Sequence, residues 1–249
     1  MERGYHHLFT TDNDILDMVD EINLDELIQW VPSKVGTLHG NKIYDFMTPR
    51  DLLNFTPLSL LNRIRLGAVT LILKYLKNWR RLENITAAQW LKKWAGREVY
   101  DVFWEPMLRG KFGEEFYEQV GMAWIWGKIN TRFASRKGLG KEVLGYPRGS
   151  FDAIFTKLED LIVRQGNEVV TGAEVKNIRH QNKTPVLDID FRNGKTISRE
   201  FDAVIATTQS HMFLRIAQSI PQDYKSKLAS TNYLAAVLIL LVLNRPLSN

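Results

Sequence analysis

Residues 172–206 read GAEVKNIRHQNKTPVLDIDFRNGKTISREFDAVIA, and this stretch decides the fold class. Three of its segments, 175–180, 186–191 and 195–201, carry Val, Ile, Thr and Phe among polar residues, which is typical of half-buried strands. The last two segments are joined at Asn193-Gly194, the strongest short hairpin signal. We therefore expect a three-stranded meander, followed by a further buried strand over residues 202–206.

The segments on either side of the meander combine helices with short apolar strands. Ser150 is placed to cap a helix over residues 151–164 that stops at Gly166, and residues 168–170 suggest a short strand. Residues 207–210 open a further helix. The apolar run 234–243 has about half the ~20 residues that a membrane-spanning helix needs, so residues 233–243 are predicted to form a buried strand.

The N-terminal half has mostly helical periodicity, with caps at several expected helix ends. A hairpin is expected around His39-Gly40-Asn41, Thr48 and Thr86 are placed to cap helices, and Gly96 to end one in a left-handed conformation. The expected helices are 12–22, the one after Thr48, 58–76, 87–95, 98–108 and 116–132. The helix at 58–76 has apolar residues on more than one face. The periodicity changes near Gly145, which predicts a mixed α/β (α+β) fold with a mostly helical part, a small sheet and a separate lobe containing the meander.

Composition excludes several classes of protein. The 249 residues are 45% hydrophobic and 24% charged, which is ordinary for a globular chain. There is no cysteine, so disulfides, zinc-thiolate sites and cysteine nucleophiles are excluded. Lys and Arg number 33 against 28 Asp and Glu, and they are scattered, so we expect no nucleic acid partner. Without a signal peptide or a long apolar segment, the prediction is a cytoplasmic protein.

Two short motifs suggest a dinucleotide-binding loop and a metal site, but neither has the spacing that such a site requires. Gly138-Leu139-Gly140 lacks both a preceding strand and the third glycine of a dinucleotide-binding loop, whose next candidate is Gly145. His6-His7 could suggest a metal, but adjacent residues of a strand point to opposite faces. We predict no metal site.

An aromatic and basic stretch admits two interpretations. Trp104, Arg109 and Lys111 could line a pocket for a flat, acidic ligand through stacking and carboxylate pairing. The alternative is that the tryptophans lie in a core with snorkelling cations, and that Arg109 pairs with a structural carboxylate such as Glu105. Spacing alone favours this alternative.

Several segments together, in the order of the chain, resemble the flavin-dependent amine oxidase superfamily, specifically its protoporphyrinogen-oxidase-like and carotenoid-desaturase-like branch. These segments are 2–9 with 16–27, the proline-to-glycine stretch 106–113, the turn before a helix at 144–151, the strand 172–178 and the return strand 202–208. The resemblance covers nearly the whole chain. The sequence departs from the family pattern at Gly149-Ser150, where a glycine pair is usual, and at Gln209, where proline is common.

This resemblance implies an FAD-dependent oxidoreductase in which a hydride passes from a hydrophobic or cyclic substrate to flavin. Tyr5 and His6 would lie beside the flavin ring, Arg148 and Gly149 near the flavin and the substrate, Val175 near adenine, and Thr207 on the return strand toward the cofactor. Trp104, Arg109 and Trp126 would line the substrate cavity, and Arg109 or Arg148 would anchor an acidic group. No residue stands out as a general base.

The resemblance also implies a division of the chain. Residues 1–9 would be a strand of the FAD domain, 10–144 the helical part of a substrate-binding domain, 145–208 a partial FAD-binding lobe, and 209–249 a return to the substrate domain. The family's N-terminal glycine motif, which holds the FAD pyrophosphate, and its C-terminal FAD segment are absent from these residues. We therefore expect an internal portion of a flavoenzyme that binds FAD weakly or not at all.

Two other functions remain open at this point. One is a flavin-dependent isomerase of the sugar-nucleotide mutase type, and the other is a non-enzymatic, Trp-rich helical interaction module. The expected partner is a small-molecule substrate, with peripheral membrane contact as a further possibility.

Overall fold

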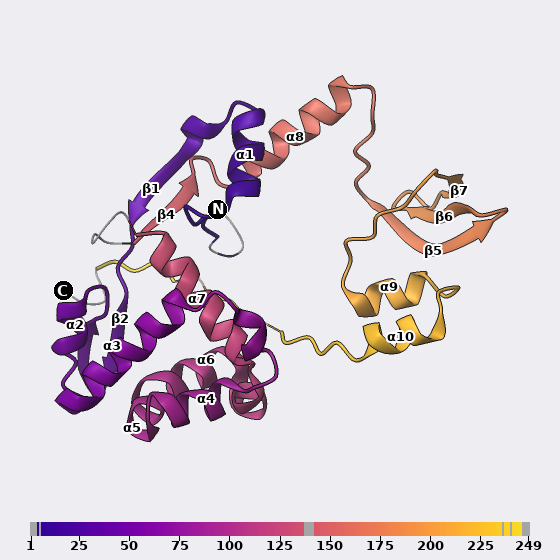
Figure 1. Cartoon of the computed structure of the whole chain (residues 1–249). Helices are drawn as coiled ribbons and strands as arrows, with labels where there is room; N and C mark the ends of the chain where they lie inside the picture. The colour runs from indigo at the N-terminus through magenta and orange to yellow at the C-terminus, as the bar shows by residue number, and fades with distance from the viewer. Residues whose placement is uncertain (1–3, 5, 137–141, 236, 240, 246–249) are drawn as a thin grey trace. The chain divides into compact units, whose positions relative to one another are not determined.

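The computed structural model describes residues 4, 6–136, 142–235, 237–239 and 241–245, and it divides into two compact units (Figure 1). Unit 1 is Met1–Leu158 and unit 2 is Glu159–Asn249. Helices and small antiparallel sheets occur in both units, which confirms the mixed α/β fold class. The predicted functional division at residues 9, 144 and 208 stays a prediction. Among the described residues, no helix has the length and apolar character required to cross a membrane.

A helical bundle forms the main core of unit 1. Its elements are α2 (Pro49–Leu53), α3 (Leu60–Tyr75), η2 (Trp79–Leu82), α4 (Ala87–Trp94), α5 (Arg97–Val99), the π-helical turn η3 (Tyr100–Trp104), α6 (Glu105–Phe116), η4 (Tyr117–Gln119) and α7 (Met122–Ala134). Most of these helices contribute buried side chains to one core, with fully enclosed residues such as Phe55, Leu73, Leu91 and Leu108. Removal of this apolar surface from water stabilises the bundle.

Local capping signals place several of these helices where the sequence predicts them. The Thr48 hydroxyl accepts from the backbone N–H of Asp51, and the Asp51 carboxylate accepts from the backbone N–H of Thr48, which completes a capping box at α2. At α4 the Thr86 hydroxyl accepts from the backbone N–H of Gln89, and Gly96 ends that helix region with a φ of 94°. The predicted helix at 116–132 is wrong at its start. Val120 is extended there, and α7 begins at Met122.

The small sheets of unit 1 pair segments both near and far in the chain. The predicted hairpin is confirmed as β2 (Gly36–His39) and β3 (Lys42–Asp45), with Gly40 at a φ of 59° in the turn. A second antiparallel pair, β1 (Ile28–Pro32) with β4 (Val143–Pro147), joins segments more than a hundred residues apart. On the other side of β4, Leu8 exchanges two backbone hydrogen bonds of 2.8 Å with Gly145. The helices α1 (Asn13–Glu21) and η1 (Asp25–Leu27) lie between Leu8 and β1 in the chain.

Unit 2 contains the predicted meander. Its strands are β5 (Ala173–Gln181), β6 (Thr184–Phe191) and β7 (Thr196–Glu200), in the order β5-β6-β7, with a bulge in β5 between Val175 and Asn177. The helix α8 (Asp152–Arg164) runs across the boundary between the two units, and α9 (Ser210–Ile216), which packs on β5, is followed by α10 (Gln222–Ala229).

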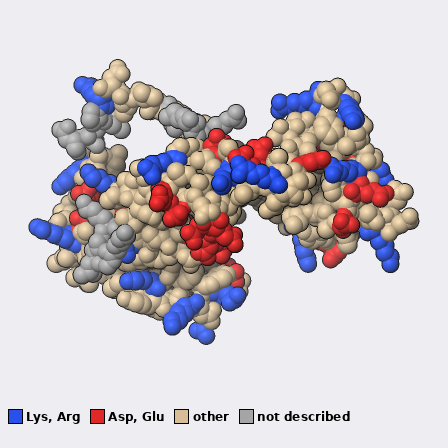
Figure 2. Space-filling view, turned by 90° about the horizontal axis from the view of Figure 1, so that it is seen from above, with Lys and Arg blue, Asp and Glu red and all other residues tan. Residues whose placement is uncertain are grey.

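On the face seen in Figure 2, Lys and Arg side chains lie at scattered positions, with Asp and Glu among them.

Three predicted strands are wrong. Residues 168–170 and 202–206 have no strand structure, and neither do the described residues of 233–243, many of which are well exposed. A strand needs a neighbour whose backbone pairs with its own N–H and C=O groups. Among the described residues, none of these three segments pairs with a strand, and the sheet of unit 2 consists of β5, β6 and β7 alone. Apolar composition alone therefore led to the wrong secondary structure.

Tyr100 supplies a test of the bundle core. Its hydroxyl is buried, finds no hydrogen-bond partner among the described residues, and has its pKa raised to about 12 by burial and by nearby Glu105. Tyr100→Phe is expected to leave stability at pH 7 unchanged or raise it by up to about 1 kcal/mol, since an unsatisfied buried hydroxyl is removed. The folded-state pKa lies above the ordinary value of 10, so the unfolded chain ionises first as the pH rises.

Alkaline urea titrations of Tyr100→Phe and the unmodified protein check this expectation. The unmodified protein should lose stability from about pH 10 upward, and the variant should lose less. Destabilisation of the variant at pH 7 would show that the hydroxyl makes a stabilising contact.

Candidate functional site

The turn between β4 and α8 is the first part of the candidate site. Gly149 and Ser150 both have left-handed conformations, with φ of 83° and 74°. The Ser150 hydroxyl accepts from the backbone N–H of Asp152 at 3.2 Å and so caps α8 as predicted. A Cβ at Gly149 would meet only Ala153, at 3.9 Å. The turn therefore presents open backbone at the N-terminal end of a 13-residue helix, where N–H groups and the helix dipole favour an anionic or acceptor ligand.

The N-terminal segment lies beside this turn. Leu8 is held to Gly145 by its two backbone hydrogen bonds, and the His6 ring meets the edge of Phe151 with centroids 6.1 Å apart. His7 lies near the ring of Tyr146, at 6.3 Å. The structure thus brings His6 close to the turn that carries Gly149. Both residues belong to the predicted flavin site, and they come from opposite ends of unit 1. Tyr5, the other residue predicted there, lies outside the described residues.

An ion pair between a buried carboxylate and a half-exposed arginine lies at this corner of unit 1. Glu142 is 2% exposed, and its carboxylate accepts from Arg132 at 3.1 Å. The Ser135 hydroxyl, also buried, accepts from the backbone N–H of Thr10 at 3.0 Å. Burial, with the positive charge of Arg132 as the next cause, lowers the pKa of His7. Sequence reasoning did not find Glu142 or Arg132, because a single acid before a strand has no local pattern that distinguishes it.

The two arginines of the predicted substrate site have different surroundings. Arg109 hydrogen-bonds Glu105 at 2.9 Å and both Glu114 oxygens at 2.8 and 2.9 Å, and its guanidinium also donates to the Tyr117 hydroxyl. Arg148 is exposed and donates to the Glu26 carbonyl at 2.8 Å, and no carboxylate of the described residues pairs with it. Arg109 thus pairs with structural carboxylates, as the alternative interpretation of the sequence expects. Arg148, beside Gly149, keeps most of its N–H groups available for a ligand.

The predicted tryptophans lie in the helical bundle. Trp104 is 6% exposed in the π-helical turn η3 and packs edge-to-face on Phe103. Trp126 on α7 donates to the Leu76 carbonyl at 2.8 Å and stacks on Trp79. These contacts belong to the bundle core and do not bring either indole to Arg148.

The other predicted cofactor residues lie in unit 2. Val175 is half-buried on β5 opposite Ile189, and β5 is an edge strand of its sheet, so alternate backbone groups on its outer side have no strand partner among the described residues. Thr207 is exposed in the irregular segment before α9.

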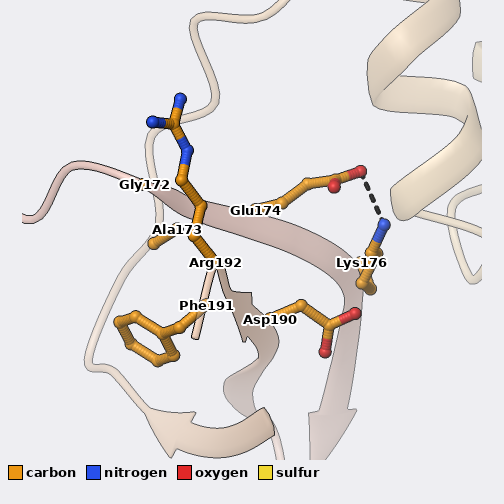
Figure 3. Close-up of a pocket in the computed structure, with 7 residues that line it drawn as sticks. All are labelled: Gly172, Ala173, Glu174, Lys176, Asp190, Phe191 and Arg192. Carbon is orange, nitrogen blue, oxygen red and sulfur yellow. Dashed lines mark ion pairs between the residues drawn. The ribbon is translucent and has the colours of Figure 1, made fainter. Parts of the chain in front are cut away.

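A polar pocket of about 370 Å³ lies next to Val175 (Figure 3). It is lined by Gly172, Ala173, Glu174, Lys176, Asp190, Phe191 and Arg192. Glu174 and Lys176 form an ion pair of 2.8 Å, and the Arg192 guanidinium points away from that pair. A second pocket, also of about 370 Å³, lies between the sheet, residues 202–206 and α9.

Asp188 in β6 provides a pH test of the sheet that carries Val175. Hydrogen bonds from Arg179 and Ser198 lower its pKa to about 2 from an ordinary 3.8. Since the folded-state pKa is depressed, the stabilisation is complete above about pH 4 and is lost as the pH falls toward 2. Asp188→Asn is expected to remove that acid dependence and weaken the Arg179 contact. Acid titration of circular dichroism near 218 nm checks the sheet signal, with Asp223→Asn on α10 as the control.

The described residues fit a flavin cofactor in two respects. The Gly149 turn offers open backbone beside Arg148, which suits an acceptor or anionic group of the cofactor. The outer edge of β5 offers backbone donors and acceptors beside Val175, which suits a nucleobase edge.

Comparison with known protein families now identifies the chain. The model of the flavin containing amine oxidoreductase family matches residues 1–247, across both units. No curated protein matches the chain at a significant level. The chain therefore belongs to the flavin-containing amine oxidoreductase family, a family of flavin-dependent oxidoreductases.

Proposed function

We propose that this protein is an FAD-dependent oxidoreductase of the protoporphyrinogen-oxidase-like and carotenoid-desaturase-like branch, acting on a hydrophobic or cyclic substrate. The observation that carries the proposal is the family match over residues 1–247, which includes both the Gly149 turn and the β5 edge. When bound, FAD supplies the hydride acceptor. The role of the chain is to bind and orient cofactor and substrate and to exclude water.

Three parts of the chain have separate tasks in this proposal. The backbone at Gly149 would contact the flavin, and Val175 on the β5 edge would contact the adenine. The His6 side chain lies against Phe151, next to the Gly149 turn. The Glu142–Arg132 ion pair and the Leu8–Gly145 backbone pairing position that turn. A hydride transfer to flavin needs no strong general base, in keeping with the residues present.

Flavin titration of the purified protein tests the cofactor. FAD is expected to give a saturable change in flavin fluorescence, to be lost on desalting, and to bind more tightly than FMN because the adenine contact is present only in FAD. Gly149→Val should weaken this binding by at least about tenfold. Gly166→Val is the matched control, because Gly166 also has a φ of 83° and open space around it.

Three results would count against the proposal. If flavin fluorescence shows no saturable change, flavin binding by these residues is excluded. If Gly149→Val and Gly166→Val lose FAD affinity equally, the loss is due to backbone strain and not to a contact at Gly149. Turnover without net oxidation of substrate would indicate the isomerase alternative of the sugar-nucleotide mutase type.

Arg148 is proposed to anchor an acidic substituent of the substrate. Arg148→Ala is expected to lower kcat/KM for a carboxylate-bearing substrate by roughly 1.5–3 kcal/mol, the scale of a charged hydrogen bond, and to spare its methyl ester. Arg109→Ala should instead lower the melting temperature and affect both substrates equally, because Arg109 pairs with Glu105 and Glu114. Steady-state kinetics on the acid and ester, with thermal melts, separate the two roles. Equal losses on both substrates for Arg148→Ala would exclude the anchor.

A further inference from the structure

The outer face of α3 is apolar along its whole length. Ordinarily a helix at the surface of a globular domain turns its apolar stripe to the core and its polar side to water. On α3, six large apolar side chains are between 50% and 74% exposed, and Ala68 among them is exposed as well. They are Leu60, Leu61, Ile64, Leu71, Ile72 and Tyr75. We call these six residues the α3 stripe.

The stripe lies opposite the face that holds α3 in the bundle. Successive helical residues are turned by about 100°, which groups the α3 stripe on one side and Leu66, Val69 and Leu73 on the other. Those three side chains are buried in the core of the bundle. The helix is therefore fixed by its inner face, and the outer face is presented already folded, so a partner would bind it without an ordering cost.

The stripe is bordered by positive charge. By the same helical geometry Arg65 lies along one edge, and Arg63 and Lys74 lie along the other. Lys77, Arg80 and Arg81 follow at the end of the helix, and all three are exposed. Residues 58–82 contain these six cations and no Asp or Glu. Within the described part of the chain, no carboxylate forms an ion pair with any of the six.

This combination points to an anionic, apolar surface as the partner. Arg63 and Arg65 donate to backbone carbonyls, which leaves their net charge in place. A second copy of the chain would set these six cations against six others, which opposes pairing through this face. An anionic lipid surface offers both the apolar layer for the stripe and the negative charge for its border. The 16-residue helix is shorter than the ~20 residues needed to span a bilayer, so it would lie in the interface with its inner face still on the protein.

We propose that the α3 stripe and its bordering cations dock the protein on anionic lipid surfaces. The apolar side chains enter the boundary between headgroups and acyl chains, and Lys77, Arg80 and Arg81 contact lipid phosphates. The surface is separate from the Gly149 turn and from the β5 edge, so this interaction does not depend on the proposed redox function.

Vesicle flotation with the purified chain tests the proposal. Vesicles of phosphatidylcholine alone are compared with vesicles that also contain about 30% phosphatidylglycerol, at low and high salt. The apolar variant is Leu61→Gln/Ile64→Gln/Leu71→Gln, and its control is Phe155→Gln/Ile162→Gln/Val163→Gln on α8, whose side chains are also exposed. The charge variant is Lys77→Gln/Arg80→Gln/Arg81→Gln, and its control is Lys183→Gln/Lys195→Gln/Lys227→Gln, which removes the same net charge from exposed positions of unit 2.

The unmodified chain is expected to bind the anionic vesicles, more weakly at high salt, and to bind the neutral vesicles at least about tenfold more weakly. Each α3 variant should lose at least about tenfold in partitioning, while each control keeps the original value. Circular dichroism melts establish that the variants fold.

Three results would overturn the proposal. The first is no flotation with anionic vesicles, and the second is equal losses in the α3 variants and their controls. The third is self-association in lipid-free solution, by sedimentation equilibrium, that the apolar variant abolishes, which would mean that a second copy covers the stripe.

Discussion

Phe55→Ala is expected to lower the free energy of unfolding by about 3–5 kcal/mol, the range for removing a fully buried phenylalanine ring. Phe55 is 0% exposed and sits among Tyr44, Phe46 and Phe103, with centroids at 5.2, 5.5 and 6.2 Å and the rings close to perpendicular. It joins the β2–β3 hairpin to the helical bundle. Alanine would leave a cavity that these rings, themselves constrained by the helices, fill only in part.

Urea unfolding followed by tryptophan fluorescence measures this effect, because the tryptophans of the bundle report on unit 1. The matched control is Phe155→Ala, which removes the same ring from a position that is 63% exposed and should cost less than about 1 kcal/mol. A loss under about 1.5 kcal/mol for Phe55→Ala would mean that the site collapses around the missing ring.

Arg132→Leu is expected to destabilise unit 1 by about 2–3 kcal/mol, because it leaves the Glu142 carboxylate buried without its cation. This is less than the roughly 3–5 kcal/mol expected for breaking a fully buried pair, because the Arg132 side chain is 49% exposed and water reaches one side of the contact. Arg132→Leu/Glu142→Leu should recover most of the loss, because both the charge and its burial penalty are removed together. Urea unfolding of Arg132→Leu, Glu142→Leu and the double variant gives the coupling energy between the two side chains.

The same substitution has a second readout at His7. Arg132 is one of the charges that lower the pKa of His7, after burial, so its removal should raise that pKa. An NMR titration of the His7 ring measures the shift, and Lys128→Leu, which removes a weaker neighbouring charge, serves as the control. An unchanged His7 pKa together with no recovery in the double variant would show that the pair does not organise this corner.

Elements defined by neighbouring residues were predicted well. The helices after Thr48 and Thr86 begin at their capping hydroxyls, and the β6–β7 hairpin turns at Asn193-Gly194, since each of these signals acts within a few residues. The Ser150 hydroxyl, which accepts from the first backbone N–H of α8, follows the same logic. The resemblance of several ordered segments also indicated the family that the comparison then showed.

Elements that depend on a distant partner were not predicted. The strands expected at 202–206 and 233–243 are apolar enough but lack a pairing neighbour among the described residues, whereas β1 and β4 were missed although they pair over five positions. The same limit applies to the side chains: Glu142 matters because of Arg132 and the buried corner around it, and Arg109 differs from Arg148 because of Glu114 and Tyr117.

The division follows from the range of the forces involved. Caps, turns and helical periodicity are set by hydrogen bonds and steric limits within one or two turns of chain, so the residues themselves carry that information. Strand pairing, burial of a charge and exposure of the α3 stripe depend on which remote surfaces meet, and that is settled only when the chain packs.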